Sequence, residues 1–429
     1  MVQFPSSPDV VIVGAGVAGI GASLALTQLG VPHIVLESKQ RVGGRAYSDE
    51  SCLGHLWDHG CHWFHSADVN ILRKLALAIG HDHGESDRNR MSMRFSAGEW
   101  HRQDFDDDPV WQQLDRIPES GSKGPDQAAS QVLDTMSPLY PVVRTWCQLI
   151  YSADPEELSC HDAAAYSDSH VNIPVRAGYG ALVARMARGL PIRLGTKVTA
   201  IEVIPDGVSV ATSEGVLKAR SCILAVPARV MEKGFLKITP SVPPALENAF
   251  AAVPLGYGEK IAISFDKPVL AGLGAGYGTI FDPPSADTAL MFELHPFGRP
   301  LAICHVGGSI AQSLLKDGEP AMIELALDNL VKAFGGSIRK HVGRTAVTQW
   351  TKDPEIGGAY SCAKPGKAKE RMHFREPLHE RIFMAGEHTH PHYFATAHGA
   401  YESGIRAAEQ AAALCGFPKA EIDPLKLAA

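Results

Sequence analysis

The sequence predicts an α/β protein, in which a parallel sheet carries an inserted antiparallel meander and a separate α+β domain is attached. Three observations carry this prediction. A strand, a glycine turn and a helix open the chain at residues 9–30, three short strands follow one another at 197–219, and a strand and a long helix close the chain at 381–414. Alternation of strands and helices predicts a parallel sheet, whereas consecutive short strands predict an antiparallel one.

The chain opens with a predicted strand, a glycine turn, a helix, a second strand and an acid, at residues 9–13, 14–19, 20–29, 33–36 and Glu37. This is the order of parts in a βαβ unit that binds a dinucleotide. The helix N-terminus offers free N–H groups and a partial positive charge to a pyrophosphate. Because all the parts are present in order, a nucleotide site is favoured over an ordinary glycine turn.

The three glycines of this turn have separate tasks in such a unit. Gly14 permits the tight turn, Gly16 lets a pyrophosphate approach the backbone, and Gly19 lets the helix pack on the strand. These residues alone do not separate NAD from FAD. Two glycines and an arginine at 43–45, soon after Glu37, add a second place where backbone and guanidinium can meet an anionic group. A second clamp of this kind is not expected in an NAD enzyme.

Composition and charge exclude several classes of protein. The chain has 429 residues, with 40 Lys and Arg against 47 Asp and Glu and a formal net charge of -7, which argues against a nucleic-acid binder. The first residues lack a signal-peptide pattern and no apolar run is long enough to span a bilayer, so a cytoplasmic protein without a membrane segment is expected. The 8 cysteines are scattered without a C-x-x-C pair, as expected for reduced thiols.

No metal site is predicted. His388, His390 and His392 form the tight cluster among the histidines, but no carboxylate or thiol stands at a known metal-binding spacing from them. They are interpreted as loop histidines.

The region between the opening unit and the meander contains polar and irregular stretches. Residues 58–66, rich in histidine and aromatic residues, are either a loop that returns to a ligand site or a packed turn, and composition leaves both open. Helical patterns cover 70–78 and 128–150, the second interrupted by prolines. Residues 82–124 predict a peripheral cap with a flexible loop. The acidic run at 104–108 either attracts a cationic substrate or is solvated surface.

After the meander, a buried strand at 222–226 is predicted to return the chain to the main sheet. A second excursion begins at 240–254 and leads into an antiparallel substrate domain. Its predicted strands lie at 259–265, 289–294, 300–307 and 345–350, with a helix at 319–334. A strand at 381–387 and a helix at 398–414 then return to the nucleotide site, where the helix N-terminus is a second anion or carbonyl site.

The predicted domains are therefore discontinuous. Residues 1–75, 176–230 and 350–429 are predicted to form the nucleotide-binding domain, and residues 76–175 and 231–349 the substrate-binding domain. Both ends of the chain build the first domain, and the middle builds most of the second.

In combination, these motifs resemble the flavin-containing amine oxidase family, which includes monoamine oxidases, polyamine oxidases and lysine-specific histone demethylases. The resemblance covers nearly the whole chain. Its matching parts are 14–37, 43–45, 60–65, 178–182, 225–227, Lys260, 350–366 and 385–406. The closing stretch is most similar to the polyamine oxidase and histone demethylase branch. The long helical tower of the demethylases has no counterpart in the sequence, which favours a free-standing oxidase of small amines.

The resemblance implies FAD as the cofactor and assigns roles by position. Lys260 matches the lysine that holds a water against the reactive flavin nitrogen, although without the resemblance a solvated strand lysine is the simpler interpretation. Tyr360 matches one wall of an aromatic cage that steers an amine nitrogen, while Thr396 replaces the second aromatic wall. His62 matches a histidine near the substrate nitrogens of polyamine oxidases. The residues implied to bind FAD are Gly14, Gly16, Ala18, Gly19, Glu37, Ser38, Gly43, Gly44, Arg45, Val198, Trp350, Gly386, Glu387, Thr396 and Ala397.

The mode of FAD attachment is also implied. Monoamine oxidases attach FAD through a cysteine just before the cage tyrosine, and Ala359 stands at that position here. Cys362 lies beyond the tyrosine. The resemblance therefore implies non-covalent FAD.

The resemblance implies removal of a hydride from the carbon next to an uncharged amine nitrogen. The imine then hydrolyses to an aldehyde or ketone, and O2 is reduced to H2O2. The expected partners are a small-molecule amine and O2, and the sequence also allows a homodimer. Two alternatives stay open: a flavin-dependent desaturase or oxidase of carbon–carbon bonds, similar to carotenoid desaturases or protoporphyrinogen oxidase, and a non-catalytic binder similar to the carriers of prenylated GTPases. Fold alone does not decide among them, and the sequence does not identify the amine.

Overall fold

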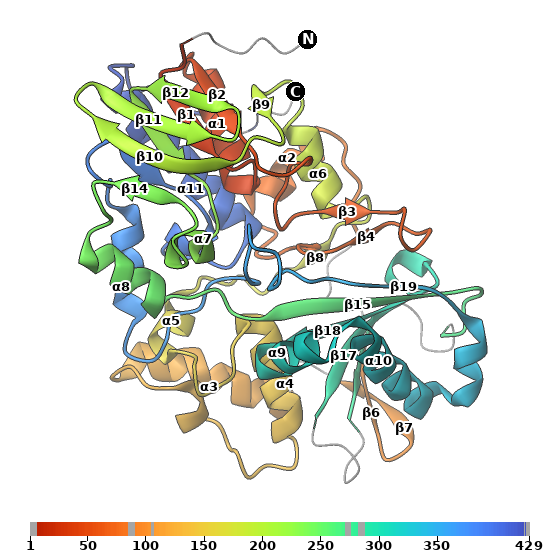
Figure 1. Cartoon of the computed structure of the whole chain (residues 1–429). Coiled ribbons are helices and arrows are strands. Elements are labelled where there is room, and N and C mark those ends of the chain that lie inside the picture. Colours follow the sequence, from red (N-terminus) through yellow and green to blue (C-terminus); the bar gives the residue numbers. More distant parts are fainter. Residues whose placement is uncertain are drawn as a thin grey trace.

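In the computed structural model, the first and last segments of the chain lie together, and the middle of the chain forms the opposite part of the molecule (Figure 1). The red N-terminal elements and the long blue C-terminal helix share one side, whereas teal strands and helices build the other. The structure describes residues 7–84, 91–103, 107–270, 276–281, 288–423 and 425. The predicted fold class is confirmed, with a parallel sheet, an antiparallel meander and a second sheet of its own.

A parallel sheet with the strand order β20-β13-β1-β2-β9 is the centre of the first part. Its strands are β1 (Val10–Val13), β2 (His33–Leu36), β9 (Ile192–Arg193), β13 (Ser221–Leu224) and β20 (Ile382–Met384). β1 pairs with β2 on one side and β13 on the other, and its apolar side chains are buried on both faces, as a central parallel strand requires. The strands predicted at 222–226 and 381–387 both return to this sheet.

The predicted meander packs on one face of the parallel sheet. It consists of β10 (Val198–Ile204), β11 (Gly207–Thr212) and β12 (Gly215–Ala219), paired antiparallel. A further strand, β14 (Lys237–Thr239), pairs parallel with β10. Helix α8 (Pro244–Ala252) buries its apolar side chains in the same core as the meander and the sheet. After the meander, the chain therefore stays on this side of the molecule until the end of α8.

Two helices from opposite ends of the chain cover the other face of the parallel sheet. They are α1 (Val17–Gln28) and α11 (Ala397–Leu414), and they share one core cluster with alternate residues of β1. A Cβ added at Gly404 would lie 2.0 Å from the carbonyl oxygen of Ala18, and one at Gly21 would lie 2.7 Å from that of Tyr401. The glycines thus allow the two helix backbones to touch.

A second sheet, with the order β19-β15-β18-β17-β16-β6-β7, forms the substrate side. Its strands are β6 (Met91–Ser96), β7 (Glu99–Gln103), β15 (Gly258–Phe265), β16 (Gly276–Ile280), β17 (Leu290–Leu294), β18 (Leu301–Gly307) and β19 (Val342–Val347). Helices α9 (Gly308–Asp317) and α10 (Glu319–Phe334) pack against its apolar side chains. The predicted strand at 345–350 ends earlier than expected, because the chain turns away from β15 after Val347 and Trp350 lies beyond the pairing.

The prediction of a flexible cap at 82–124 is wrong for much of that segment. The hairpin β6–β7 extends the second sheet, and α3 (Pro109–Lys123) is a regular helix that continues through Pro118. The helix is stabilised despite its proline because Val110 and Ile117 are buried and Gly121 lies against the backbone of α5 (Cys160–Ala165). The proline and the polar residues around it conceal this apolar periodicity in the sequence.

The acidic run at 104–108 has a structural task at its last residue. Asp108 precedes α3, and its Oδ1 accepts a hydrogen bond from the backbone N–H of Val110 at 2.7 Å. Its Oδ2 accepts a hydrogen bond from the Arg94 guanidinium, also at 2.7 Å. Asp108 is therefore a helix cap paired with an arginine, and not solvated surface. Asp104 and Asp106 lie outside the described residues.

Shorter elements connect the two parts. The helices are α2 (Ile71–Ala78), α4 (Tyr140–Tyr151), α5, α6 (Tyr179–Met186) and α7 (Ala228–Glu232), and the short strands are β3 (Ser48–Asp49), β4 (Trp57–Asp58), β5 (Trp63–Phe64) and β8 (Ile173–Pro174). The helix predicted at 128–150 begins only at Tyr140, so that Pro138 precedes it and Pro141 lies in its first turn, where a proline is tolerated, while Ala129–Gln131 form a separate 3-10 turn. Among the described residues, no helix combines the length and apolar composition needed to cross a bilayer.

The division of the chain into two domains stays a proposal. We propose that residues 1–75, 176–230 and 350–429 act as the nucleotide-binding domain, and residues 76–175 and 231–349 as the substrate-binding domain. The first boundary falls within α2, and β14 and α8 pack with the nucleotide side although they follow residue 230.

The contact between α1 and α11 gives a test of the fold. We expect Gly404→Ala to lower the free energy of unfolding by about 2 kcal/mol, because the added methyl group overlaps the Ala18 carbonyl and the helices must separate. Denaturant unfolding followed by circular dichroism measures the change. Gly336→Ala is the matched control, since no described atom lies within 4 Å of its added Cβ. Equal stabilities of the two variants would contradict this account of the helix crossing.

Candidate active site

The glycine turn after β1 combines two tight contacts with one open position. Gly14 has a φ of 101°, and a Cβ there would lie 2.6 Å from the carbonyl oxygen of Ala225. A Cβ at Gly19 would lie 1.9 Å from the carbonyl oxygen of Gly14, so α1 sits directly on the turn. At Gly16, no described atom lies within 4 Å of an added Cβ. The backbone of the turn is therefore accessible at Gly16, next to the N-terminus of α1.

Glu37, at the end of β2, folds back over this turn. Its Oε2 accepts a hydrogen bond from the Ala15 N–H at 2.7 Å, and its Oε1 accepts one from the Lys39 N–H at 2.9 Å. The Ser38 hydroxyl donates to Glu37 at 3.3 Å and to Glu355 at 2.9 Å. The carboxylate is thus fixed at the turn, with hydrogen bonds on both oxygens.

The second glycine pair lies against the first turn. Gly43 and Gly44 both have positive φ angles, 94° and 57°. Gly43 forms a parallel bridge with Gly16, and its N–H donates to the Ala15 carbonyl at 2.8 Å. A Cβ at Gly44 would lie 3.5 Å from the Cα of Gly16. The two glycine segments therefore form one cradle of backbone.

An arginine and a glutamate join this cradle to the end of the chain. Arg45 donates hydrogen bonds to the Ala359 carbonyl and to Glu387 Oε1, the latter at 3.1 Å. The other oxygen of Glu387 accepts from the Ser361 hydroxyl at 2.7 Å and from the Ala395 N–H at 2.9 Å. Burial alone would raise the pKa of Glu387. The Arg45 charge and the hydrogen bond from Ser361 are among the interactions that outweigh burial, so the pKa lies below its usual value. The carboxylate is therefore ionised and held by three separate segments.

The N-terminus of α11 begins beside Glu387. Thr396 caps the helix: its hydroxyl accepts from the Gly399 N–H at 3.0 Å and donates to the Tyr393 carbonyl at 2.6 Å. Ala397 is the first helical residue, and Gly386, with a φ of 138°, ends the preceding strand. The threonine hydroxyl is thus engaged within its own helix end.

Lys260 extends from β15 to the loop that follows β4. Its Nζ donates to the Asp58 carbonyl at 2.9 Å and to the Gly60 carbonyl at 2.8 Å, and it lies 3.1 Å from His62 Nδ1. Only 7% of Lys260 is exposed. Burial lowers its pKa, and the nearby Asp58 charge offsets part of that effect. Lys260 is therefore a buried lysine that donates to two carbonyl oxygens and contacts a histidine nitrogen, and not a solvated one.

His62 connects Lys260 with polar residues of the second sheet. Its Nε2 lies 3.9 Å from Glu293 Oε2, and its ring centre lies 5.3 Å from that of His305. Burial lowers the pKa of both histidines well below 6.5, and the Lys260 charge lowers it further. His62, Lys260, Glu293 and Asp58 line a cavity of about 20 Å³, which has room for roughly one water.

Glu293 and His305 were not predicted as part of the site. They lie on β17 and β18, whose other residues are almost all apolar and buried. A titratable residue within an otherwise apolar strand is the signal that could have found them, because such a residue needs a buried polar partner.

Trp350 and Tyr360 lie on the segment that returns from the second sheet. The Trp350 N–H donates to Glu259 at 3.0 Å, and its indole N–H donates to the His59 carbonyl at 3.2 Å. The Tyr360 hydroxyl donates to the Leu149 carbonyl at the end of α4. Both aromatic residues are thus tied to elements on the substrate side.

The structure gathers most of the sequence-predicted residues around the cradle. Residues 14–19, 37–38, 43–45 and 386–387 meet there through the contacts described above. Ala18 is buried in α1 under Gly404, and Val198 is buried at the start of β10. Lys260 and His62 contact each other on the other side of the loop after β4.

The histidine cluster near the end of the chain does not converge. His388 is buried with its ring centre 5.0 Å from that of Phe374, and burial lowers its pKa to about 4. His390 lies 3.1 Å from Glu402, while His392 is exposed. The three rings have different surroundings, and His388 lies in the 3-10 turn Glu387–Thr389, not in a loop.

Comparison with known proteins identifies the family. The family model described as flavin containing amine oxidoreductase matches residues 17–120 and 136–412. The chain belongs to this family. The match includes α1, the loop after β4, Lys260 and the N-terminus of α11, and it therefore covers both sides of the site.

Individual relatives of this amine oxidoreductase agree with the assignment. Polyamine oxidase 4 of Oryza sativa subsp. japonica is 28% identical over 444 residues, covering 95% of this chain and 89% of that protein. Lysine-specific histone demethylase 2 of Homo sapiens is 26% identical over 454 residues, covering 94% of this chain and 53% of that protein. The structure of cyclohexylamine oxidase from Brevibacterium oxydans IH-35A superposes with a TM-score of 0.78 at 21% identity, over 96% of this chain and 99% of that chain, and shows the same fold.

As a member of this family, the protein is an FAD-dependent amine oxidase whose FAD is bound non-covalently. The residues present fit that cofactor. Gly16 leaves open space beside a helix N-terminus, where a pyrophosphate finds N–H donors. Ala359 offers no sulfur for a covalent bond, and the buried thiol of Cys362 is directed to the Ala363 carbonyl at 3.7 Å.

The amine oxidase's glycine turn gives two contrasting variants. We expect Gly16→Ala to fold with nearly unchanged stability but to bind FAD at least about tenfold more weakly, because its methyl group enters the space left for the cofactor. Gly19→Ala places its methyl group on the Gly14 carbonyl and is expected to destabilise the apoprotein itself.

Titration of each apoprotein with FAD, followed by quenching of flavin fluorescence, measures the affinity, and thermal unfolding of the apoproteins measures stability. Normal FAD affinity of a folded Gly16→Ala variant would contradict the placement of the cofactor at this turn.

Proposed function

We propose that this amine oxidase removes a hydride from the carbon next to an uncharged nitrogen of a di- or polyamine, and that O2 accepts the electrons to give H2O2. The imine is hydrolysed by water to an aldehyde or ketone. FAD supplies the hydride acceptor when bound. The observation that carries the proposal is the partly buried contact of Lys260 Nζ with His62 Nδ1 at 3.1 Å, beside the glycine cradle.

Lys260 and His62 are proposed to hold and move protons for the reaction with O2, which takes up two protons per H2O2. In protonated Lys260, the three N–H groups face Asp58 O, Gly60 O and His62 Nδ1. Burial lowers the pKa of both residues, which makes the Lys260 proton easier to release and keeps the His62 ring a neutral acceptor. The pair thus places a transferable proton in a water-sized, low-dielectric space.

A di- or polyamine is favoured by the site and by the relatives. Tyr360 is proposed as one wall of an amine-binding cage, and its hydroxyl is fixed on the Leu149 carbonyl. Thr396, in the place of a second aromatic wall, is smaller and leaves room for an extended chain. His62 is proposed to lie near the substrate nitrogens. Relatives described as polyamine oxidases, 28% identical to this chain, support this choice.

The remaining predicted residues are proposed to hold FAD. Glu37 and Ser38 would hold the adenosine ribose, and Gly16 with the second glycine pair would admit the pyrophosphate. Arg45 is proposed to contact the phosphate and flavin region, and its pairing with Glu387 supports a fixed position there. Ala397 at the N-terminus of α11 is proposed to face the flavin ring, because helix N–H groups favour electron-rich atoms.

Anaerobic mixing of the holoenzyme with a panel of monoamines, diamines, polyamines and amino acids tests the proposed function. We expect di- and polyamines to bleach the flavin absorbance, and peroxide to form when air is admitted. Bleaching by monoamines alone would overturn the substrate class. A flavin that no amine bleaches, but that an apolar polyene reduces, would overturn amine oxidation in favour of carbon–carbon desaturation.

Lys260→Met tests the proton-holding role. We expect the rate of flavin re-oxidation by O2 to fall about a hundredfold, because the proton beside His62 is lost, while anaerobic reduction by the amine persists. Stopped-flow absorbance measures the two half-reactions separately. Lys316→Met, at an exposed position on α9, is the control and should match the unmodified enzyme. Unchanged re-oxidation in Lys260→Met would remove Lys260 from this role.

A further inference from the structure

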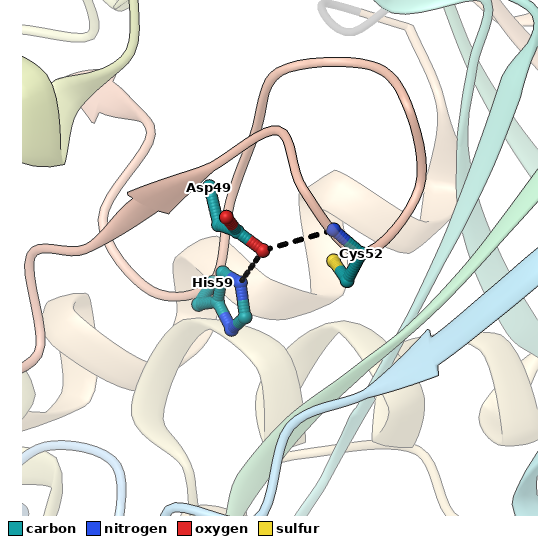
Figure 2. A group of neighbouring side chains, drawn as sticks. All are labelled: Asp49, Cys52 and His59. Carbon is teal, nitrogen blue, oxygen red and sulfur yellow. Dashed lines mark hydrogen bonds and ion pairs between the residues drawn. The ribbon is translucent and has the colours of Figure 1, made fainter.

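A second cluster of titratable side chains lies on the β3–β4 hairpin, outside the site described above. Figure 2 shows Asp49 at the end of β3, Cys52 on the connecting loop and His59 just after β4, with the aspartate carboxylate directed toward the other two residues. One ligand atom from each, an oxygen, a sulfur and a nitrogen, lie within 4.8 Å of one another. The cluster thus offers one donor of each kind at close range.

The aspartate is oriented by its own loop. Its Oδ1 accepts hydrogen bonds from the Ser51 N–H at 3.0 Å and the Ser51 hydroxyl at 2.8 Å. Its Oδ2 accepts a longer bond from the Cys52 N–H at 3.3 Å and faces His59 Nε2 at 3.9 Å. Ser51 therefore fixes the carboxylate through one oxygen, and the second oxygen is directed to the middle of the cluster.

The histidine supplies an independent sign of a missing ligand. The His59 ring is held between Tyr47 and Trp57, with ring centres 4.7 Å and 4.2 Å away. Its Nε2 is buried and has no hydrogen-bond partner among the described residues, although it is directed toward Asp49. A buried polar nitrogen without a hydrogen bond is costly, and a bound cation would satisfy it.

The sulfur of the cluster is also held in place. The Cys52 Sγ accepts a hydrogen bond from the Trp57 indole N–H at 3.1 Å, a contact that also suits a thiolate. Burial and the contact with Asp49 raise the pKa of the Cys52 thiol, so a bound cation has to displace its proton.

We propose that Asp49, Cys52 and His59 form a binding site for a divalent cation of the zinc class. Carboxylate oxygen, thiolate sulfur and imidazole nitrogen are ligands that Zn²⁺ takes in a tetrahedral arrangement, with a water in the fourth position. On binding, the Cys52 S–H bond is broken, its proton passes to solvent, and a sulfur–metal bond forms without a change of oxidation state.

Another group of possible ligands, His62, Glu293 and His305, is less suited to a cation. One ligand atom from each of these residues also lies within 4.8 Å of the other two. However, His62 Nδ1 lies 3.1 Å from the Lys260 ammonium group. Lys260 thus contacts a ligand side chain of that cluster, whereas at the hairpin it contacts the backbone carbonyls of Asp58 and Gly60, and a positive charge in direct contact with a ligand opposes a second cation. The hairpin is therefore the proposed site. The test below compares it with the buried group as the alternative zinc site.

A cation on the hairpin would act on the Lys260 environment through the backbone. His59 lies between Asp58 and Gly60, whose carbonyl oxygens accept the Lys260 hydrogen bonds. Ligation of Asp49, Cys52 and His59 joins the two strands and the loop between them. The metal is therefore expected to stabilise the hairpin and not to take part in amine oxidation.

Equilibrium dialysis of the FAD-loaded enzyme, stripped of metals by a chelator, against micromolar Zn²⁺ tests the site. We expect one zinc per chain in the unmodified enzyme, and binding about tenfold weaker or more in Asp49→Asn, Cys52→Ser and His59→Gln. His341→Gln removes a histidine that pairs with Asp266 at 3.0 Å without a thiol, and it should keep the zinc. Flavin absorbance and thermal unfolding verify that each variant is folded.

Alkylation of thiols in the folded enzyme, read by mass spectrometry, supplies a second measurement that does not depend on the variants. Zn²⁺ should protect Cys52 from iodoacetamide and leave the reactivity of the partly exposed Cys61 unchanged. The proposal is overturned if no zinc is retained at micromolar concentration, if Cys52 is not protected, or if zinc is lost in Glu293→Gln and kept in Cys52→Ser.

Discussion

Two helices from opposite ends of the chain, α1 and α11, cross with their backbones in contact, and glycines at the crossing make that distance possible. The crossing places the N-terminus of α1, after the glycine turn, on the same sheet as the N-terminus of α11, after Gly386. Anything that separated the helices would also separate the glycine cradle from Glu387. The geometry of the cofactor site thus depends on a packing distance set by residues that need not touch the cofactor.

The buried charges next to Glu387 are arranged so that each has several partners. Glu387 receives hydrogen bonds from Arg45, Ser361 and Ala395, and Ser361 also accepts one from Arg371. Arg371 in turn forms a buried pair with Asp162 at 2.7 Å. Because a buried charge is tolerated only when it is paired and hydrogen-bonded, this chain of contacts holds distant segments together around the site. Arg371 and Asp162 belong to it, although neither was assigned to the site from the sequence.

Much of the fold was predictable because its signals are local. The strand at Val10–Val13, the three glycines after it and the meander each have a period or a turn chemistry that can be read within a few residues. The prediction failed where tertiary packing overrides local preference: α3 runs through Pro118 because its apolar face is buried, and Tyr140 starts a helix that was expected earlier. For the site, Lys260 was found through family resemblance alone, and its burial comes from strands that are far apart in sequence. Glu293, His305 and the cluster around Asp49 were missed because their proximity is created by sheet pairing and by a loop, and no spacing rule describes either.

The hydrogen-bond acceptors of Lys260 influence which substitutions this site can tolerate during evolution. Two of them, at Asp58 and Gly60, are main-chain oxygens, which every amino acid supplies. The path of the backbone there depends in turn on the residues at these positions. A Cβ at Gly60 would lie 1.9 Å from the Arg45 carbonyl oxygen, and the Asp58 carboxylate accepts hydrogen bonds from the Tyr179 and Gly180 N–H groups. Selection for a new amine can then act on the walls of the pocket while the lysine's surroundings are inherited unchanged. What is maintained in this part of the enzyme is the course of the backbone, and Asp58 and Gly60 matter to the lysine because they hold that course.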